Sequence, residues 1–249
     1  MKYNEQRIMR ELRLYLFAAL ACLGLGSCLK SSFTYNGYVD LANVVNETTL
    51  AADGGVTYNI VENNAGTEFK DMERVIINCD LLEAPKAEGT QIKLNSFIQV
   101  HTDKAVSIEE GQDPNVLYGC DSLNIGYRRL SGNGEHQYLT VGFSYEVNKG
   151  SETEHVFTLV YEPEGESERD IHFYLYHNAD GDIPAKDAKD DTKEIKMRYV
   201  SFEAEEIFKN LKLDNSSRIY IVSAFEKYSE EDDKTPEDDK TAGAEALTL

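Results

Sequence analysis

The sequence predicts an all-β protein with two domains, and three features of the chain support this prediction. The chain is rich in Val, Ile, Thr, Phe and Tyr and has no Trp, a composition that suits pleated, half-buried strands. Apolar and polar residues alternate at residues 74–82 and 138–147, which is the period of a strand. Turn sequences such as Asp53-Gly54-Gly55 and Asn148-Lys149-Gly150 separate such runs, as expected for antiparallel sheets.

Residues 1–27 have the organisation of a secretory signal peptide. Four basic residues precede an apolar run at residues 14–26, and a run of this length is too short for a stable membrane span. It ends at Leu25-Gly26-Ser27-Cys28, which resembles the bacterial lipobox. We therefore expect cleavage immediately before Cys28, acylation of its thiol, and a tether at residues 28–32. Two alternatives remain open, an ordinary signal peptide with a chance cysteine and an anchor that is never cleaved.

The net charge excludes several classes of partner. The formal charge is −20, and removal of residues 1–27 takes away four basic and two acidic side chains, which leaves −22. Nucleic-acid binding needs clustered Lys and Arg, and here basic residues never cluster beyond Arg128-Arg129. The acidic excess also disfavours anionic membrane surfaces. Contact with a bilayer should therefore go through lipid, which anchors firmly when it comprises more than one acyl chain.

Residues 33–110 are predicted to form a small β-barrel. Strands are expected at residues 33–45, 57–62, 74–82 and 91–100. Turn sequences at residues 53–55 and 63–66, and a break at residues 85–89, separate them. About five short strands would leave exposed edges in an open sheet, so we expect a closed or nearly closed barrel.

Residues 111–228 are predicted to form a β-sandwich after a polar connector at residues 109–114. Longer strands are expected at residues 138–147, 155–161, 171–177, 196–202 and 218–225. Ser201 is a candidate N-cap for one short helix at residues 202–211. Residues 229–249 are acidic and almost free of apolar side chains. We expect disorder there, because such a segment cannot offset the entropy lost on ordering.

The order of several short segments also resembles a known family. After the lipobox the chain carries Gly37-Tyr38-Val39, Asp53-Gly54-Gly55, Arg74-Val75-Ile76, Asp113-Pro114, Tyr138-Leu139-Thr140-Val141, His155-Val156-Phe157-Thr158-Leu159-Val160, Tyr176-His177-Asn178-Ala179-Asp180-Gly181-Asp182 and Val200-Ser201-Phe202. This order resembles the NigD-like lipoproteins of Bacteroidetes over nearly the whole chain after Cys28, except the acidic tail. The resemblance implies an OB-like barrel followed by a β-sandwich. It brings no catalytic motif with it.

The resemblance bears on the location of the protein. In lipoproteins of Bacteroidetes, an acidic stretch just after the lipidated cysteine resembles a signal for export to the cell surface. Leu29-Lys30-Ser31-Ser32 contains no acidic residue. We therefore expect a protein anchored in the outer membrane that faces the periplasm.

The run at residues 177–182 is the strongest candidate for metal chemistry. Asn178, Asp180 and Asp182 place three oxygen ligands at alternating positions, and Ca²⁺ takes six to eight oxygen ligands. The spacing of Gly181 departs from that of an EF-hand loop. The alternative is a solvated hairpin tip, in which such side chains bond their own main chain.

Histidines and cysteines offer two further candidate sites. A zinc site from His155, His172 and His177 is conceivable, but His172 and His177 are five positions apart on one strand and should point to opposite faces. Ordinary half-buried histidines are therefore favoured. Cys79 and Cys120 allow a disulfide in an oxidising compartment, or are two unrelated buried residues.

No pattern typical of catalysis is present. The chain lacks a Gly-x-Ser-x-Gly elbow and a His-Glu-x-x-His pair, and no cofactor motif was found. Five tyrosines are candidates for an outward-facing binding patch: Tyr118, Tyr127, Tyr138, Tyr174 and Tyr176. The first hypothesis is therefore a non-enzymatic envelope lipoprotein that binds a protein or glycan. The alternatives are a bacteriocin-immunity lipoprotein and a glycan-active enzyme with a carboxylate pair.

Overall fold

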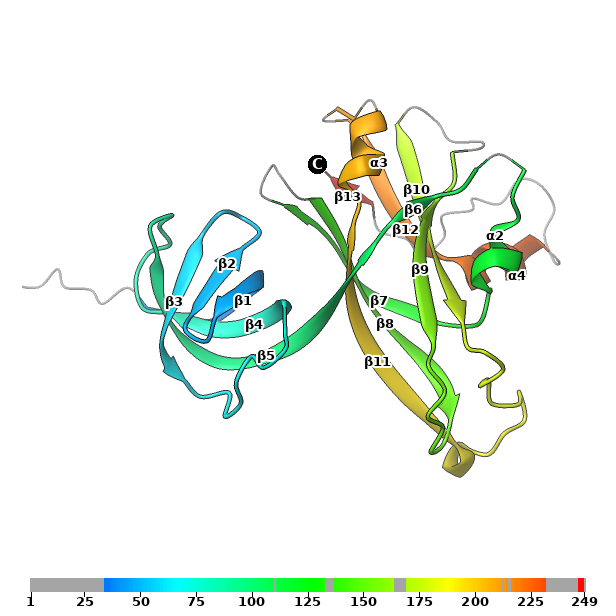
Figure 1. The fold of residues 1–249 in the computed structure, drawn as a ribbon, viewed down its shortest axis with the longest axis horizontal. Coiled ribbons are helices and arrows are strands. Elements are labelled where there is room, and N and C mark those ends of the chain that lie inside the picture. The colour runs from blue at the N-terminus through cyan, green and yellow to red at the C-terminus, as the bar shows by residue number, and fades with distance from the viewer. Residues whose placement is uncertain are drawn as a thin grey trace, which may run out of the picture.

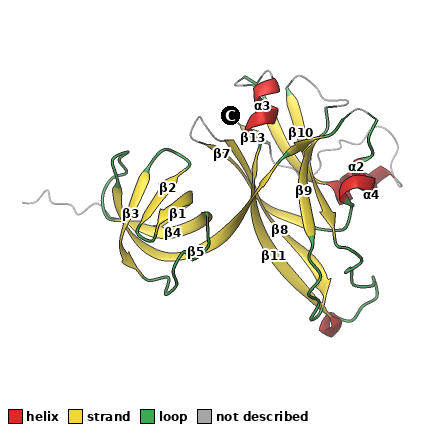
Figure 2. Cartoon of the chain, in the orientation of Figure 1, coloured by secondary structure: helices red, strands yellow, loops and turns green. Residues whose placement is uncertain are grey.

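The computed structural model describes residues 34–109, 111–132, 137–163, 169–211, 213–214, 216–231 and 246–248. It confirms the all-β fold class, because strands dominate both lobes and the helices are short (Figures 1 and 2). Cys28, residues 1–27 and the tether at residues 28–32 lie outside the described residues. None of the described helices is long and apolar enough to span a lipid bilayer.

The N-terminal lobe is a five-stranded barrel. Its strands are β1 (Tyr35–Asn46), β2 (Thr49–Ala52), β3 (Thr57–Asn63), β4 (Arg74–Leu81) and β5 (Thr90–Lys104). Neighbouring strands pair in the order β3-β2-β1-β4-β5, and a parallel pairing of β3 with β5 closes the ring. This closed ring with a parallel final pair is the OB-like barrel expected from the resemblance. The prediction missed β2, which is only four residues long.

The C-terminal lobe is a β-sandwich of two sheets. One sheet contains β7 (Asn124–Gly132), β8 (Gln137–Asn148) and β11 (Lys193–Glu203), and the other contains β6 (Val106–Ser107), β9 (Val156–Tyr161), β10 (Asp170–Asn178), β12 (Arg218–Ser223) and β13 (Leu247–Thr248). Short helical segments connect them: α2 (Pro114–Tyr118), η1 (Asp190–Thr192), α3 (Glu205–Asn210) and α4 (Ala224–Glu231). The two sheets pack their apolar faces together, as in other sandwiches.

Strand β5 belongs to both lobes. Its first part pairs with β4 in the barrel, and its last residues, His101–Lys104, pair in parallel with Val200–Glu203 of β11. One continuous sheet of eight strands therefore runs from the barrel into the sandwich, and Figure 1 shows β5 crossing between the lobes.

Alternating side chains build the two cores. On β4, Val75, Ile77, Cys79 and Leu81 are buried, which confirms the strand that alternation predicts at residues 74–82. On β8 the alternation predicted at residues 138–147 is also confirmed, with Leu139, Val141, Phe143, Tyr145 and Val147 buried. Burial of one large apolar side chain contributes about 1.5–3 kcal/mol to stability. The inward side chains of β4 and β8 therefore stabilise the barrel and the sandwich.

A fully buried arginine joins the lobes. Arg74 of β4 forms an ion pair with Asp53 in the barrel, and its Nη1 also donates to Asn43 at 2.8 Å. Across the junction, its Nε donates to the Ser201 hydroxyl of β11 at 2.8 Å. The guanidinium also lies 4.1 Å from the ring centre of Tyr138. A buried charge tolerates this position only because every side of it is partnered.

A second polar contact crosses the same junction. Arg129 of β7 donates to Asp40 of β1 at 2.8 Å, and the Tyr58 hydroxyl donates to the other oxygen of Asp40 at 2.9 Å. Burial raises the pKa of Tyr58, and the neighbouring carboxylate raises it further. Tyr58 therefore stays a neutral donor in this contact.

Two predictions for the C-terminal half are wrong. Ser201 does not cap a helix: it lies in β11 and binds Arg74, and the helix begins later, at Glu205, after the uncapped Ala204. Disorder throughout residues 229–249 is also wrong, because Leu247–Thr248 form β13, which pairs with Arg218 and Ile219 of β12. Leu247 packs against the sandwich core, so an apolar residue that the prediction discounted finds a buried position.

Candidate functional site

The three predicted Ca²⁺ ligands are used in different ways. The Asn178 side chain accepts the Asp180 main-chain N–H at 2.9 Å, as in a hairpin tip. Asp182 is buried, and its Oδ1 accepts both the main-chain N–H and the side-chain amide of Asn148, at 3.1 and 2.7 Å. Within the part of the chain that the structure describes, no group of three or more His, Cys, Asp or Glu is arranged to hold a metal ion.

Two of the three histidines considered for a zinc site, His155 and His177, contact each other, and His155 also contacts Asp182. His155 Nδ1 lies 2.8 Å from His177 Nε2, and His155 Nε2 lies 3.1 Å from Asp182 Oδ2. His177 Nδ1 in turn lies 3.1 Å from the carbonyl oxygen of Ser122. His172 points to the opposite face, as predicted, and stacks on Tyr220 with 4.9 Å between ring centres.

The polarity of this chain of hydrogen bonds is fixed at both ends. The Ser122 carbonyl oxygen can only accept, so His177 donates from Nδ1 and a neutral ring then accepts at Nε2. His155 must therefore donate from Nδ1, while its Nε2 faces the carboxylate of Asp182. Three bonds need three protons, one more than two neutral imidazoles carry.

The pKa values of Asp182 and His177, at the two ends of this chain, are both lowered. Burial alone would raise the pKa of Asp182. Hydrogen bonds from Ser151, His155 and Asn148 outweigh burial and hold this pKa well below its usual range. Burial lowers the pKa of His177, a hydrogen bond from its ring to a main-chain carbonyl opposes the shift, and the charge on His155 lowers it further. Asp182 is therefore ionised at neutral pH, and its carboxylate lies 3.1 Å from His155 Nε2.

A tight crossing of the chain positions Ser122 beside His177. Asp113 caps α2, which ends at Gly119. At Gly119 the chain passes so close to β10 that a Cβ would lie 2.9 Å from the carbonyl oxygen of His177, and φ is +76°. Glycine is therefore required. Asp121 completes the crossing, since its N–H donates to that same carbonyl at 2.8 Å and its carboxylate accepts the Ala179 N–H at 2.7 Å.

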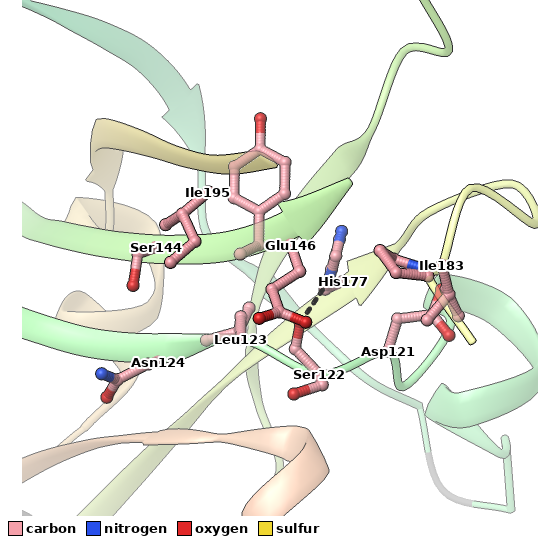
Figure 3. A pocket seen from close by; sticks show the side chains of 11 residues that line it. Asp121, Ser122, Leu123, Asn124, Ser144, Glu146, His177, Ile183 and Ile195 are labelled. Carbon is pink, nitrogen blue, oxygen red and sulfur yellow. Dashed lines mark hydrogen bonds between the residues drawn. The ribbon is translucent and has the colours of Figure 1, made fainter. Parts of the chain in front are cut away.

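His177 lines a surface pocket of about 280 Å³ at the start of β7. Figure 3 shows how the crossing at Asp121–Leu123, the outward side chains of β8 and the loop at Ile183 surround it, with His177 bonded to Ser122. The lining residues are Asp121, Ser122, Leu123, Asn124, Ser144, Tyr145, Glu146, His177, Ile183, Pro184 and Ile195. Acidic, apolar and hydroxyl side chains line it, and no Lys or Arg is among them.

The main chain of β8 contributes to this pocket. The last residue of β8 that pairs with β7 is Ser144, opposite Asn124. On the other side, Lys149 donates to Thr192, so odd-numbered residues of β8 direct their N–H groups towards β11. Even-numbered residues of β8 direct their main-chain N–H groups to the opposite side, towards β7. Asn148 is an example, since its N–H donates to Asp182 on that side. Glu146 lies between, so by this alternation its main-chain N–H and C=O point away from β11, to the side where the printed pairing of β7 with β8 has ended.

The tyrosine patch and the disulfide do not form. Tyr138 and Tyr176 are buried, so the prediction that they face outwards is wrong, and the tyrosines do not gather at the pocket. Cys79 and Cys120 are both free thiols. Burial in the barrel core raises the pKa of Cys79 to about 12, so it stays an inert thiol.

Comparison with known proteins supports the architecture. The family model described as "NigD-like C-terminal beta sandwich domain" matches residues 104–233. The structure of a protein of unknown function from Bacteroides vulgatus is 20% identical, with a TM-score of 0.52 over 76% of this chain and 83% of that chain. No curated protein matches the sequence.

Two further solved structures are more distant. A NigD-like immunity protein from Bacteroides caccae is 18% identical, with a TM-score of 0.48 over 75% of this chain and 86% of that one. A protein from Bacteroides fragilis, provisionally named a lipoprotein, is 16% identical, with a TM-score of 0.46 over 75% of this chain and 87% of that one. These identities are too low to transfer a function.

Proposed function

The chain belongs to the family defined by the NigD-like C-terminal beta sandwich domain, and we propose that it is a non-enzymatic binding protein of the cell envelope. A lipid on Cys28 holds it in the outer membrane, where it faces the periplasm. Its binding site is the pocket between β7, β8 and the loop at Ile183.

The composition of the pocket supports a binding role. It combines apolar walls, hydroxyl groups and the main-chain groups of Glu146, which is the mixture typical of ligand sites. The histidine at its floor is committed on both ring nitrogens, to Ser122 and to His155. His177 therefore has no free nitrogen to act as a general base, and no nucleophile–base pair results.

The two carboxylates of the pocket argue against a glycan-cleaving enzyme. Such an enzyme needs one carboxyl group that stays protonated, to act as an acid. Asp121 accepts the Ala179 N–H, and Glu146 accepts from Lys193 Nζ at 2.9 Å. Both carboxyl groups therefore already accept a hydrogen bond from the chain itself, and the bond to Glu146 raises the pKa of Lys193.

An open main-chain edge favours a polypeptide ligand over other classes. Unpaired N–H and C=O groups on an edge strand match another extended chain. A bacteriocin held by its immunity protein is one ligand of this kind, so the immunity hypothesis is a special case of the proposed function.

The anchor is tested by replacement of Cys28. In cells grown with a labelled fatty acid, the native protein should carry label and sediment with the membranes. Cys28→Ala should carry no label and appear in the fluid released from the periplasm, because one thioether carries all the lipid. Mass spectrometry of the mature N-terminus checks the cleavage site.

The matched control for this experiment is Cys22→Ala, which lies in the apolar run before the lipobox. It should keep the label and the membrane location. Unlabelled native protein, or a native N-terminus other than Cys28, would contradict lipidation at Cys28. The proposal that the pocket binds a ligand would not be affected.

A further inference from the structure

We propose that the pocket binds an extended segment of a polypeptide, which pairs with β8 at Glu146 and places a basic side chain beside the Glu146 carboxylate. This inference rests on the proposed function and names its ligand class. It follows from three properties of the site: the vacated strand position, the alternation of side chains along a strand, and the charge of the lining.

The strand position opposite Glu146 is vacant because the chain turns away there. Continued pairing of β7 with β8 would place Ser122 opposite Glu146, two residues before the Asn124–Ser144 pair. Instead, the Ser122 carbonyl accepts from His177, and Asp121 bonds to β10. The vacancy ends at Asn148. Its main-chain N–H donates to the Asp182 carboxylate, which takes the place of the carbonyl oxygen of a neighbouring strand. An added segment therefore pairs with residues 145–147 only, through one N–H and one C=O of Glu146.

Side-chain alternation determines what such a segment would present. Residues directly opposite each other in a sheet point to the same face. Glu146 and its partner Ile195 on β11 lie on the outward face, and Ile195 is 66% exposed. A Lys or Arg opposite Glu146 would lay its aliphatic stem by Ile195 and its charge by the carboxylate. The residues on either side of it would point inwards, towards Leu123, Tyr145 and Ile183, so they should be apolar.

The charges around the pocket favour a basic segment. Asp121 and Glu146 line it, no Lys or Arg does, and the chain as a whole has a formal charge of −20. A field of this sign steers cationic partners to the site. Lys193 already pairs with Glu146, but both side chains are partly exposed. Surface pairs of this kind contribute little, so an incoming cation can exchange with Lys193.

The proposal is tested by selection of a randomised ten-residue peptide display library on the purified full chain. The enriched peptides should share a Lys or Arg flanked by apolar residues. Synthetic copies should bind Glu146→Pro about tenfold more weakly, because proline removes the N–H that faces the vacancy. By the register of β8 with β11 that N–H points away from β11, so the fold should persist, and thermal unfolding checks this.

Two further variants separate main-chain pairing from other contributions. Glu146→Gln keeps the main chain and removes the charge, so it should weaken binding and reduce the preference for basic peptides. Ser144→Trp fills the pocket from the outward face of β8 and should abolish binding, as a second test if Glu146→Pro unfolds. Peptides that bind native protein and both Glu146→Pro and Ser144→Trp equally would overturn the proposal, as would a selection without enrichment.

A glycan array on the same protein distinguishes this inference from the proposed function. Glycan binding that Ser144→Trp abolishes, with no enriched peptide, would overturn strand pairing and leave the pocket as the binding site. The absence of any ligand dependent on this pocket in both screens would overturn the strand-pairing inference together with the assignment of the site.

Discussion

Replacing Arg74 by alanine is expected to lower the free energy of unfolding by about 3–5 kcal/mol, one of the largest losses that a single substitution in this chain should cause. The substitution leaves the Asp53 carboxylate buried without its cation and removes the bond to Ser201 that crosses the junction. Equilibrium unfolding in urea measures the effect. The barrel and the sandwich should unfold together in the native protein, because β5 and Arg74 link them.

Two variants serve as controls for Arg74. Lys93→Ala removes a surface ion pair with Glu62 and should change stability by less than about 0.5 kcal/mol. Arg74→Met combined with Asp53→Leu removes both charges and should recover part of the loss, because neither charge is left unpaired. A loss below about 1 kcal/mol for Arg74→Ala would show that water reaches the junction and that the buried network is dispensable.

Replacing Asp182 by alanine is expected to cost about 3 kcal/mol at neutral pH. The substitution leaves the main-chain and side-chain amides of Asn148 without an acceptor, and it removes the carboxylate that contacts His155 Nε2. Asp187→Ala, at an exposed position of the same loop, is the matched control and should change stability by less than about 0.5 kcal/mol.

The pH dependence gives an independent check on Asp182. Its folded-state pKa lies below the unfolded value, so its contribution is complete above about pH 4 and is lost as the pH falls through the folded value. The pKa of His177 is also lowered on folding, so the unfolded chain takes up more protons below about pH 6.5 and the native protein loses stability there too. The difference between native protein and Asp182→Ala should shrink towards pH 2. A constant difference would contradict the assigned ionisation.

Alternation explains why much of the fold could be predicted from the sequence. Residues 75–82 and 143–148 alternate between buried and more exposed positions, and burial of one face produces the period that was recognised. Residues 138–142, at the start of β8, are buried on both faces. Short or charged strands lack that signal. β2 has four residues, and β7 carries Arg128 and Arg129, whose charges are accommodated by tertiary contacts with Ile221 and Asp40.

The candidate site was harder to predict because strand register creates it. The period of β10 correctly separated His172 from His177. The meeting of His155 with His177 depends on how β9 pairs with β10, and their contact with Asp182 depends on a loop that folds back over β8. The vacant position at Glu146 results from the turn of the chain at Ser122. Nothing local in the sequence signals these events.

The central claim is that the pocket beside Glu146 is occupied by a ligand in the cell envelope. The most direct measurement is the alkylation rate of Ser144→Cys in intact cells compared with purified protein. The rate at an exposed barrel position, Val61→Cys, corrects for access of the reagent. A ligand at ten times its Kd would leave about a tenth of the sites open. We expect Ser144→Cys to react about tenfold more slowly in cells than in purified protein, after correction by Val61→Cys. Equal corrected rates in cells and in purified protein would contradict it.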